Sequence, residues 1–318
     1  MLKTLERFAR QLRARQRLLQ AVAAERKQIS REFETDNARF AQHSTPKDSL
    51  YLTVSSSDEV QTQLDRDIHR VEKGLALRNP KRPFGVDLLK RLEFLRGKSN
   101  ESSNIDVAVV DRAITDLQNW NELGEISDSS APIYEKYELP SNFDLQKFFW
   151  HRKSVRVFRN TKIERSLIET AVDLARNSPS VCNRQSWKVY AIDDEELLAK
   201  VLPLQNGNES FRSEIPVAMV ITSDLHKFSG AGERNQVWID GGLFAMSLAW
   251  ALHGLGLGSC MLNWSVLNSQ SDKLRNLLKI SDNEEIIMMM ATGYPDENIR
   301  YAKSEKKSVS EILIWPNS

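Results

Sequence analysis

A short segment near the middle of the chain carries three cations and a hydroxyl group within five residues. It reads His151-Arg152-Lys153-Ser154-Val155-Arg156-Val157-Phe158. Arginine forms paired, charge-assisted hydrogen bonds to phosphate oxygens, and a serine hydroxyl adds another donor. The apolar residues in the same run would anchor it to a hydrophobic core. The segment is a candidate phosphate clamp, although a solvated charged surface is the commoner explanation of such a run taken alone.

A polar loop is predicted between a helix that ends near Arg176 and a β-rich run that begins at Trp187. The segment from Ser178 to Trp187 reads SPSVCNRQSW. Proline, serine and asparagine favour a rigid loop, and the tryptophan is a suitable core anchor. Such a loop can present hydrogen-bond donors and acceptors to a planar ligand.

Taken together, the two segments resemble the signatures of the nitroreductase family. The loop is similar to the family's S-P-S-x-x-N-x-Q-P-W pattern, with Ser186 where proline is usual, and the R-x-S-x-R-x-F element lies at the family's distance upstream. Three further segments follow in the family's order: Asp240-Gly241-Gly242 at the start of a long apolar helix, Gly293-Tyr294-Pro295, and the basic cluster Lys303, Lys306 and Lys307. The resemblance covers roughly residues 148 to 315.

The resemblance implies an FMN-binding oxidoreductase domain that forms a homodimer with shared active sites. One set of residues is expected to hold the FMN phosphate and ribityl chain: Arg152, Lys153, Ser154 and Arg156, with Lys306, or Lys303 in its place, from later in the chain. A second set is expected to contact the flavin ring from the other subunit: Pro179, Ser180, Asn183 and Gln185. Backbone groups near Leu262 and Asn263 would reach flavin N5.

The chemistry implied by the resemblance is two-electron transfer from NADH or NADPH, through the flavin, to a small-molecule acceptor. Nearby cations would stabilise the reduced flavin, which is anionic near N1. No catalytic side chain is predicted, because His226 and His253 are lone histidines, which are more often structural. Asn263-Trp264 replaces the acidic residue and glycine that the family often has, which puts the shape and polarity of the substrate pocket in doubt.

Two alternatives remain open at this point. The first is a flavin-binding dehydrogenase or dehalogenase that does not use nicotinamide. The second is a non-catalytic interaction module, with or without flavin, attached to the amino-terminal half. A module without ligand would need neither the clamp nor the loop, which favours flavin binding.

The amino-terminal half contains one segment of note, IHRVEKGL from Ile68 to Leu75. A helix that ends in Gly74, in which Asp67–Arg70 and Arg66–Arg70 contacts are both possible at helical spacing, is the simplest interpretation. The segment also resembles an H-R-x-E-K-G-L extension found before nitroreductase-like domains in bacterial polysaccharide-biosynthesis clusters. That likeness implies a role in envelope-sugar metabolism by association only.

Hydrophobic periodicity predicts an α+β scaffold for these segments. Strands are expected at residues 187–192, 216–222, 286–294 and 312–315, and helices at about 164–176, 236–253 and 270–278. Since the strands do not each follow one helix, the pattern favours a nitroreductase-like α/β/α sandwich with a mixed, mainly antiparallel sheet over a doubly wound fold.

The region before this scaffold is predicted to be helical. Helices are expected at about 1–40, 60–77, 86–95 and 107–123, followed by the serine-rich linker ISDSSAP. The predicted division is a helical region at residues 1–140 and an FMN-binding domain at 141–318.

Composition limits the classes of partner. With 44 basic and 43 acidic side chains the net charge is +1, so no global field attracts nucleic acid.

Cys182 and Cys260 lack metal-ligand spacing and are expected to be free, buried thiols in a reducing compartment. No segment is apolar enough for a signal peptide or a membrane span, so the protein is expected to be cytoplasmic. Membrane association of the basic first helix is a minor alternative.

Overall fold

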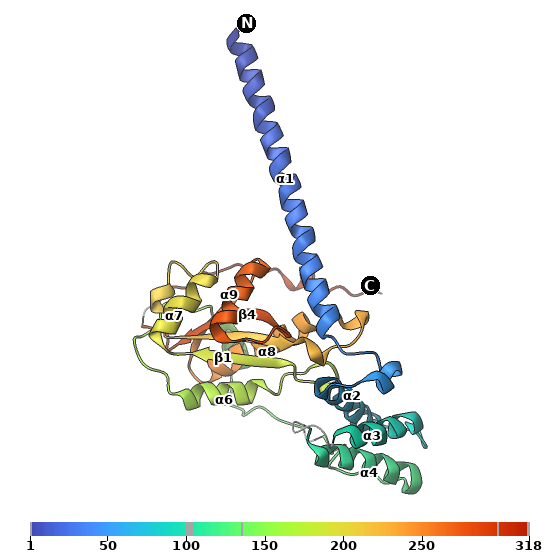
Figure 1. Cartoon of the computed structure of the whole chain (residues 1–318). Coiled ribbons are helices and arrows are strands. Elements are labelled where there is room, and N and C mark those ends of the chain that lie inside the picture. Colours follow the sequence, from blue (N-terminus) through green and yellow to red (C-terminus); the bar gives the residue numbers. More distant parts are fainter. Residues whose placement is uncertain (1, 100–104, 135, 298, 317–318) are drawn as a thin grey trace.

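A long helix, a small helical bundle and an α/β sandwich follow one another along the chain (Figure 1). The computed structural model describes residues 2–99, 105–134, 136–297 and 299–316, with side chains from residue 13 onward. Helix α1 spans Leu2–His43 and projects from the body of the molecule. Three helices form the bundle: α2 (Ser57–Leu75), α3 (Val86–Ser99) and α4 (Val107–Leu123). These four predicted helices are confirmed, and α3 is about one turn longer than expected.

Local capping explains where the bundle helices begin and end. Ser56 and Glu59 form a capping box at the start of α2. Asp106 caps the start of α4, and Gly124 ends it in the left-handed conformation with φ 81°. The helices then pack around their own cluster of buried apolar side chains, which includes Leu64 and Leu92.

The sandwich is built on a four-stranded sheet of order β1-β2-β4-β3. Its strands are β1 (Trp187–Ile192), β2 (Val217–Asp224), β3 (Gly258–Asn263) and β4 (Glu284–Gly293). Each pairing between these strands is antiparallel, and Ser154 adds an isolated parallel bridge to Ser259. The expected α+β class and mainly antiparallel sheet are therefore confirmed.

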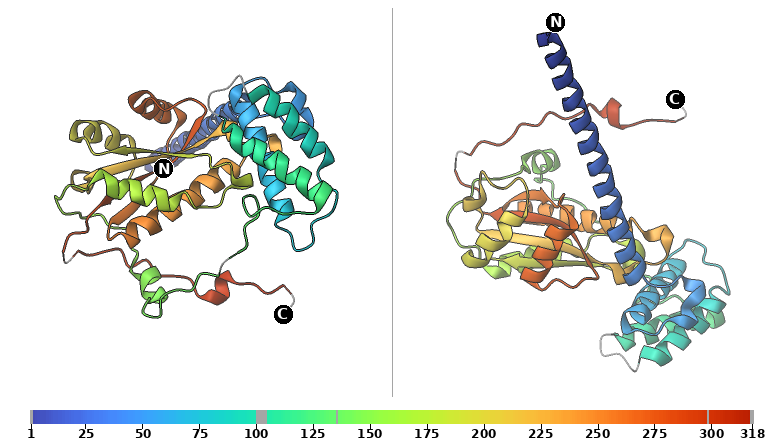
Figure 2. Two further views of the ribbon diagram at one scale, coloured as in Figure 1. Left: turned by 90° about the horizontal axis from the view of Figure 1, so that it is seen from below. Right: turned by 45° about the horizontal axis from the view of Figure 1, so that its top comes forward.

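Helices cover both faces of the sheet (Figure 2). On one face lie α6 (Arg165–Ala175) and α8 (Gln236–Gly254); on the other lie α7 (Glu195–Val201) and α9 (Asn268–Leu278). Helix α8 sits very close to β4, since a Cβ atom at Gly241 would lie 2.5 Å from the Ile287 side chain. Close packing of this kind requires glycine in the Asp240-Gly241-Gly242 segment.

The expected strand at residues 312–315 is wrong. Val309–Ile312 instead forms the short helix α10, because Ser308 and Glu311 make a capping box that favours a helical turn. The remaining strand of the sheet is β3, whose sequence GSCMLN follows the glycines that end α8. Its small residues gave too weak a β signal to be predicted. Helices α5 (Leu145–His151) and α7 were also not predicted.

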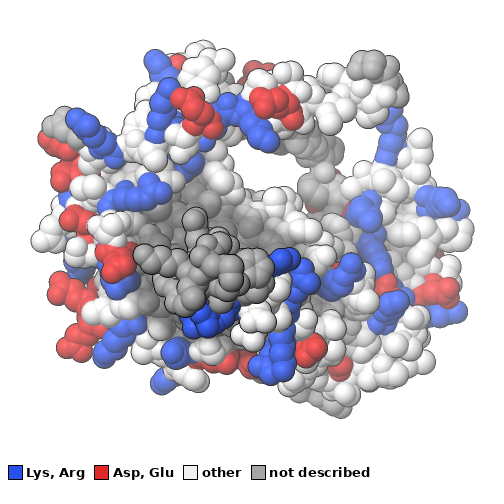
Figure 3. Space-filling model, turned by 90° about the horizontal axis from the view of Figure 1, so that it is seen from above, with Lys and Arg blue, Asp and Glu red and all other residues white. Residues whose placement is uncertain are grey.

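The face of the molecule that is seen along α1 shows no large field of one charge sign (Figure 3). Basic and acidic side chains are interspersed on the face seen along α1 (Figure 3), as the net charge of +1 leads one to expect. Among the described helices, none is both long enough and apolar enough to cross a membrane.

Candidate functional site

The predicted phosphate clamp lies beside the start of β3. The Val155 amide donates to the Ser259 carbonyl at 3.0 Å, and Val155 and Phe158 are buried, as expected for anchoring residues. Arg152 is half-buried and Arg156 is exposed. Among the described residues, no carboxylate forms an ion pair with Arg152, Lys153 or Arg156. The clamp thus holds a local excess of positive charge on a fixed stretch of backbone.

Aromatic rings border each of these cations. The Arg152 guanidinium lies 5.8 Å from the Trp250 ring, and the Lys153 ammonium lies 5.0 Å from the Tyr301 ring. Arg156 lies 5.9 Å from the Phe211 ring. Such contacts orient a cation without neutralising it. Burial raises the pKa of the neighbouring Cys260 thiol, and the positive charges of Arg156 and Arg152 oppose that rise.

The loop that follows α6 has a strained backbone. Cys182, Asn183 and Gln185 have φ angles of 50°, 51° and 46°. Residues other than glycine rarely adopt this region, and they persist there only where the surrounding structure holds them. The Ser180 hydroxyl accepts a hydrogen bond from the Gln185 amide at 3.0 Å and closes the loop on itself. Strained, closed loops of this kind are typical of ligand sites.

Two buried charged residues fix the loop to the body. Arg184 makes two hydrogen bonds to Glu233, each 2.9 Å long, and its Nε donates to the Val181 carbonyl at 3.1 Å. From the start of α8, the Asp240 carboxylate accepts a hydrogen bond from the Val181 amide at 3.1 Å. Burial raises the pKa of Asp240, whereas the hydrogen bonds from Gln236 and Val181 favour its charged form. Two motifs that are distant in the sequence therefore form one structural unit.

Replacement of Asp240 by asparagine is expected to destabilise this unit. The Val181 amide and the Gln236 side chain donate to different oxygens of the carboxylate, and asparagine offers only one acceptor. We expect Asp240→Asn to lower the free energy of unfolding by about 1–3 kcal/mol in urea denaturation. The matched control is Asp173→Asn, whose partner Arg176 is exposed, and we expect it to change stability by less than about 0.5 kcal/mol. Equal effects of the two changes would show that Asp240 does not support the loop.

The Ile68–Leu75 segment lies next to the same loop, because α2 packs against residues Val181–Asn183. The expected Asp67–Arg70 contact is confirmed at 3.0 Å, and α2 ends at Leu75, one residue after the expected Gly74. Burial lowers the pKa of His69, and the nearby charges of Lys73 and Arg184 lower it further. The bundle is thus placed to brace the loop.

The end of β3 carries the remaining predicted residues. Leu262 is buried and Asn263 is exposed. The Asn263 side chain donates to the Ser265 hydroxyl at 2.8 Å, and the Asn263 backbone carbonyl accepts from the Gln205 side chain at 3.0 Å. Neighbouring Trp264 donates to the Ser271 hydroxyl at 3.0 Å. Asn263 and Trp264, the two residues that depart from the family pattern, therefore each make specific hydrogen bonds within the fold.

A single chain does not bring the clamp and the loop together. The loop is held at Asp240, near the start of α8, whereas a Cβ atom at Gly258, just beyond the end of α8, would contact Val155 of the clamp. About 20 Å of helix separates Asp240 from Gly254. The predicted Lys303 and Lys306 lie in the exposed carboxy-terminal tail, which extends away from the sandwich (Figure 2). Within the described residues of a single chain, the two halves of the predicted site therefore lie apart.

Residues 151–208 and 204–294 match the family model described as the nitroreductase family. This part of the chain is similar to the nitroreductase family. An iodotyrosine deiodinase from Hydra vulgaris is 24% identical over 189 residues, which are 51% of this chain and 69% of the relative. A 4-nitrobenzoate reductase from Pseudomonas putida is 25% identical over 199 residues, which are 46% of this chain and 83% of the relative.

Among solved structures, an FMN-dependent nitroreductase from Clostridium difficile R20291 is similar, with 23% identity and a TM-score of 0.46. The similarity covers 55% of this chain and all of that one. The match agrees with the family that the motifs resemble, and it bears out the expected class of enzyme. The roles of the individual site residues stay predictions.

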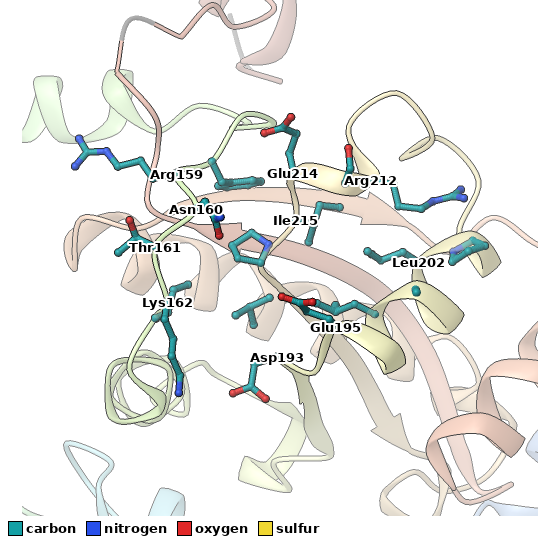
Figure 4. A pocket seen from close by; sticks show the side chains of 18 of the residues that line it. Arg159, Asn160, Thr161, Lys162, Asp193, Glu195, Leu202, Arg212, Glu214 and Ile215 are labelled. Atoms are coloured by element: carbon teal, nitrogen blue, oxygen red, sulfur yellow. The ribbon is translucent and has the colours of Figure 1, made fainter.

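The sandwich also contains an open cavity of about 970 Å³, which begins at Phe158 at the end of the clamp segment (Figure 4). Its wall carries charges of both signs, contributed by Arg159, Lys162, Asp193, Glu195 and Glu214. None of the predicted cofactor-binding residues is among the described residues that line it. Asp193 is already paired with Arg165 at 2.8 Å. We therefore do not assign the cofactor to this cavity.

Cys260 is buried, as expected, but Cys182 is only half-buried, so the expectation of two buried thiols is wrong for one of them. Cys182 belongs to the strained part of the loop, Val181–Asn183, whose residues are half-buried or exposed. The role of Asp240 in holding the loop was also missed from sequence. The only signal available was an acidic residue at the start of an apolar helix.

Proposed function

We propose that the protein is an FMN-dependent oxidoreductase in which NADH or NADPH supplies two electrons and a small organic molecule accepts them. The observation that most supports this proposal is the clamp. Its three cations lack acidic partners among the described residues, and they lie on backbone that is fixed to β3. A phosphate monoester supplies the missing negative charge. The bound flavin would supply the redox chemistry, and the protein would position it and exclude competing reactions.

We propose that the working form is a homodimer with two shared sites. Helix α8 buries one face against the sheet but leaves Trp238, Ile239 and Leu243 between 42% and 50% exposed. Phe149 and Trp150 of α5 are exposed as well, and the Phe149 ring lies 4.4 Å from the ring of Trp250 on α8. Apolar surface of this extent is typical of a protein–protein interface. Pairing through it would supply each clamp with the partner's loop.

In such a site, the clamp would hold the flavin phosphate through Arg152, Ser154 and Arg156. The partner's loop would contact the ring through Pro179 and Asn183, which are exposed in the single chain. Lys306 or Lys303 would complete the phosphate site from the tail. The polar side chain of Asn263 at the end of β3 would border the space for the acceptor.

A second candidate reaction is reductive removal of a halogen from an aromatic ring. The similarity to an iodotyrosine deiodinase favours it. In that reaction the carbon–halogen bond breaks, halide leaves, the carbon gains a proton, and the two-electron-reduced flavin is oxidised. Nitro reduction and dehalogenation therefore need the same reduced flavin and differ in the acceptor.

The two reactions can be separated with FMN-loaded protein that has been reduced under anaerobic conditions with NADPH or NADH. We expect 4-nitrobenzoate to reoxidise the flavin and to yield a reduced nitrogen product. Reoxidation by an iodinated phenol with release of iodide would instead favour the second candidate. Flavin that neither nicotinamide reduces, but that dithionite reduces, would contradict the proposed electron donor.

The metabolic setting suggested by the Ile68–Leu75 segment stays a prediction. The comparisons above give no support to a link with polysaccharide biosynthesis. We propose that the segment acts on the site through the loop against which it packs.

A further inference from the structure

Among the described side chains, helix α1 is attached to the rest of the protein only near its carboxy-terminal end. Arg39 binds Glu285 at 2.5 Å and the Asp282 carbonyl at 2.8 Å, and Phe40 packs against the core of the sandwich. Glu32 accepts a hydrogen bond from the Asn268 amide at 2.9 Å. Before Glu32, every described side chain from residue 13 onward is exposed, and the helix stands away from the body (Figures 1 and 2). In proteins, most of a helix's stability comes from the packing of its apolar face, and the exposed part of α1 has no such packing within the described residues of this chain.

The exposed part of α1 carries an apolar stripe with a seven-residue repeat. Leu19, Val22, Ile29 and Phe33 follow one another at spacings of three, seven and four residues, and they are between 39% and 69% exposed. In the sequence, the same alternation of three and four residues reaches back to Leu5, Phe8 and Leu12 and forward to Phe40. Arg15, Arg26 and Asp36 occupy the remaining positions of the repeat. The apolar and the charged residues of this repeat together occupy the a and d positions of about five heptads.

The period of the stripe indicates the kind of surface that it fits. On a straight α-helix, a stripe with a strict seven-residue repeat rotates around the helix axis by about 20° per heptad. Over five heptads the rotation is about 100°. On a membrane or a flat protein surface, the stripe would rotate out of contact within the length of α1. Another helix that supercoils around α1 stays in contact along the whole stripe.

We infer that α1 forms a parallel, in-register coiled coil with α1 of a second copy of this chain. Charge favours this orientation. Glu25 and Glu32 fall at g positions, so an antiparallel pair would place acidic residues opposite acidic residues. In a parallel pair, Glu25 of one copy lies beside Arg26 at the a position of the other. Charged residues at a few core positions lower stability but specify register.

The stripe ends beside α8. The two helices border a cavity of about 430 Å³, which is lined by Phe33 and Phe40 of α1, by Val237 and Trp238 of α8, and by charged residues that include Asp36, Arg234 and Glu285. Since Trp238 belongs to the surface through which we propose dimerisation, the same second copy can occupy both surfaces. The coiled coil itself does not depend on the flavin, so it can be tested separately from the proposed function.

Disulfide formation between chains tests the inference directly. We introduce Val22→Cys, at a d position, and as the matched control Ala24→Cys, at the outward-facing f position two residues away. Both variants keep the natural cysteines, and the linked peptides are identified by mass spectrometry after mild oxidation of dilute protein. We expect two Val22→Cys chains to become linked at the introduced thiols at least about tenfold faster than two Ala24→Cys chains, because the d positions of the two helices face each other within bonding range and the f positions lie on the outer faces.

A second change keeps the test independent of cysteine reactivity. In the Val22→Cys background, Ile29→Glu places a charge in the next d layer, whereas Arg31→Glu places one on the outer face. We expect Ile29→Glu to abolish the cross-link and Arg31→Glu to preserve it, with bound FMN unchanged in both. Equal cross-linking at positions 22 and 24 would overturn the inference. The inference would also be overturned if the Val22→Cys protein did not cross-link but co-sedimented with anionic lipid vesicles. That result would place α1 on a membrane.

Discussion

Replacing Arg152 and Arg156 together by alanine is expected to weaken FMN binding by a factor of about 10² to 10⁴. A hydrogen bond to a charged group contributes about 1.5–3 kcal/mol, two arginines about twice that, and each 1.4 kcal/mol is about a tenfold change in affinity. The loss should be large because the structure offers these cations no other charged partner among the described residues. Titration of the apoprotein with FMN, followed by flavin fluorescence, measures the effect.

The matched control is Arg159→Ala in the same segment. Arg159 is exposed and pairs with Glu297 at 3.5 Å, and it takes no part in the proposed clamp. We expect its replacement to change FMN affinity by less than about twofold. A similar loss of affinity in both variants would mean that the segment contributes general positive charge, and the clamp assignment would then be wrong.

Two defective chains are expected to restore one working site when they are paired. The first carries Arg152→Ala and Arg156→Ala, and the second carries Asn183→Glu, which places a carboxylate where the proposed ring contact lies. If each site takes its clamp from one chain and its loop from the other, a mixed dimer has one site with both defects and one site with none. Purified through two different affinity tags, the mixed dimer should hold about half the FMN of the native dimer and show about half its activity.

The contrary result is equally clear in this experiment. Sites built within single chains would each keep one defect, so the mixed dimer would be no more active than the average of its parents. The control is a mixed dimer of one native chain and one doubly defective chain, in which all three changes lie on the same chain. A shared site predicts that this dimer has almost no intact site.

The sequence predicted the parts of the site that consist of contiguous motifs. The clamp and the Ser178–Trp187 loop are each encoded in about ten residues, and the structure shows why their residue types matter. Val155 and Phe158 are buried anchors, and Asn183 adopts a positive φ that asparagine tolerates better than most residues. The central strands could be predicted for a similar reason, because their long apolar runs suit burial on both faces.

Features that depend on distant partners could not be predicted. The strand β3 contains Gly258, Ser259 and Cys260, and it is a strand because β4 and the clamp backbone pair with it. The link from Asp240 to the Val181 amide joins residues that are 59 positions apart. The tail was expected to contain a strand from its apolar residues, but the local capping box at Ser308 determines its conformation. The expected division of the chain near residue 140 stays a prediction.

The most direct test of the proposed function is the visible absorption spectrum of the purified, FMN-loaded protein before and after anaerobic addition of NADPH and, separately, NADH. The account predicts the spectrum of a bound oxidised flavin, at about one FMN per chain, that is bleached by at least one of the two nicotinamides. Protein that stays colourless after incubation with FMN would contradict the account, because the clamp would then have another ligand.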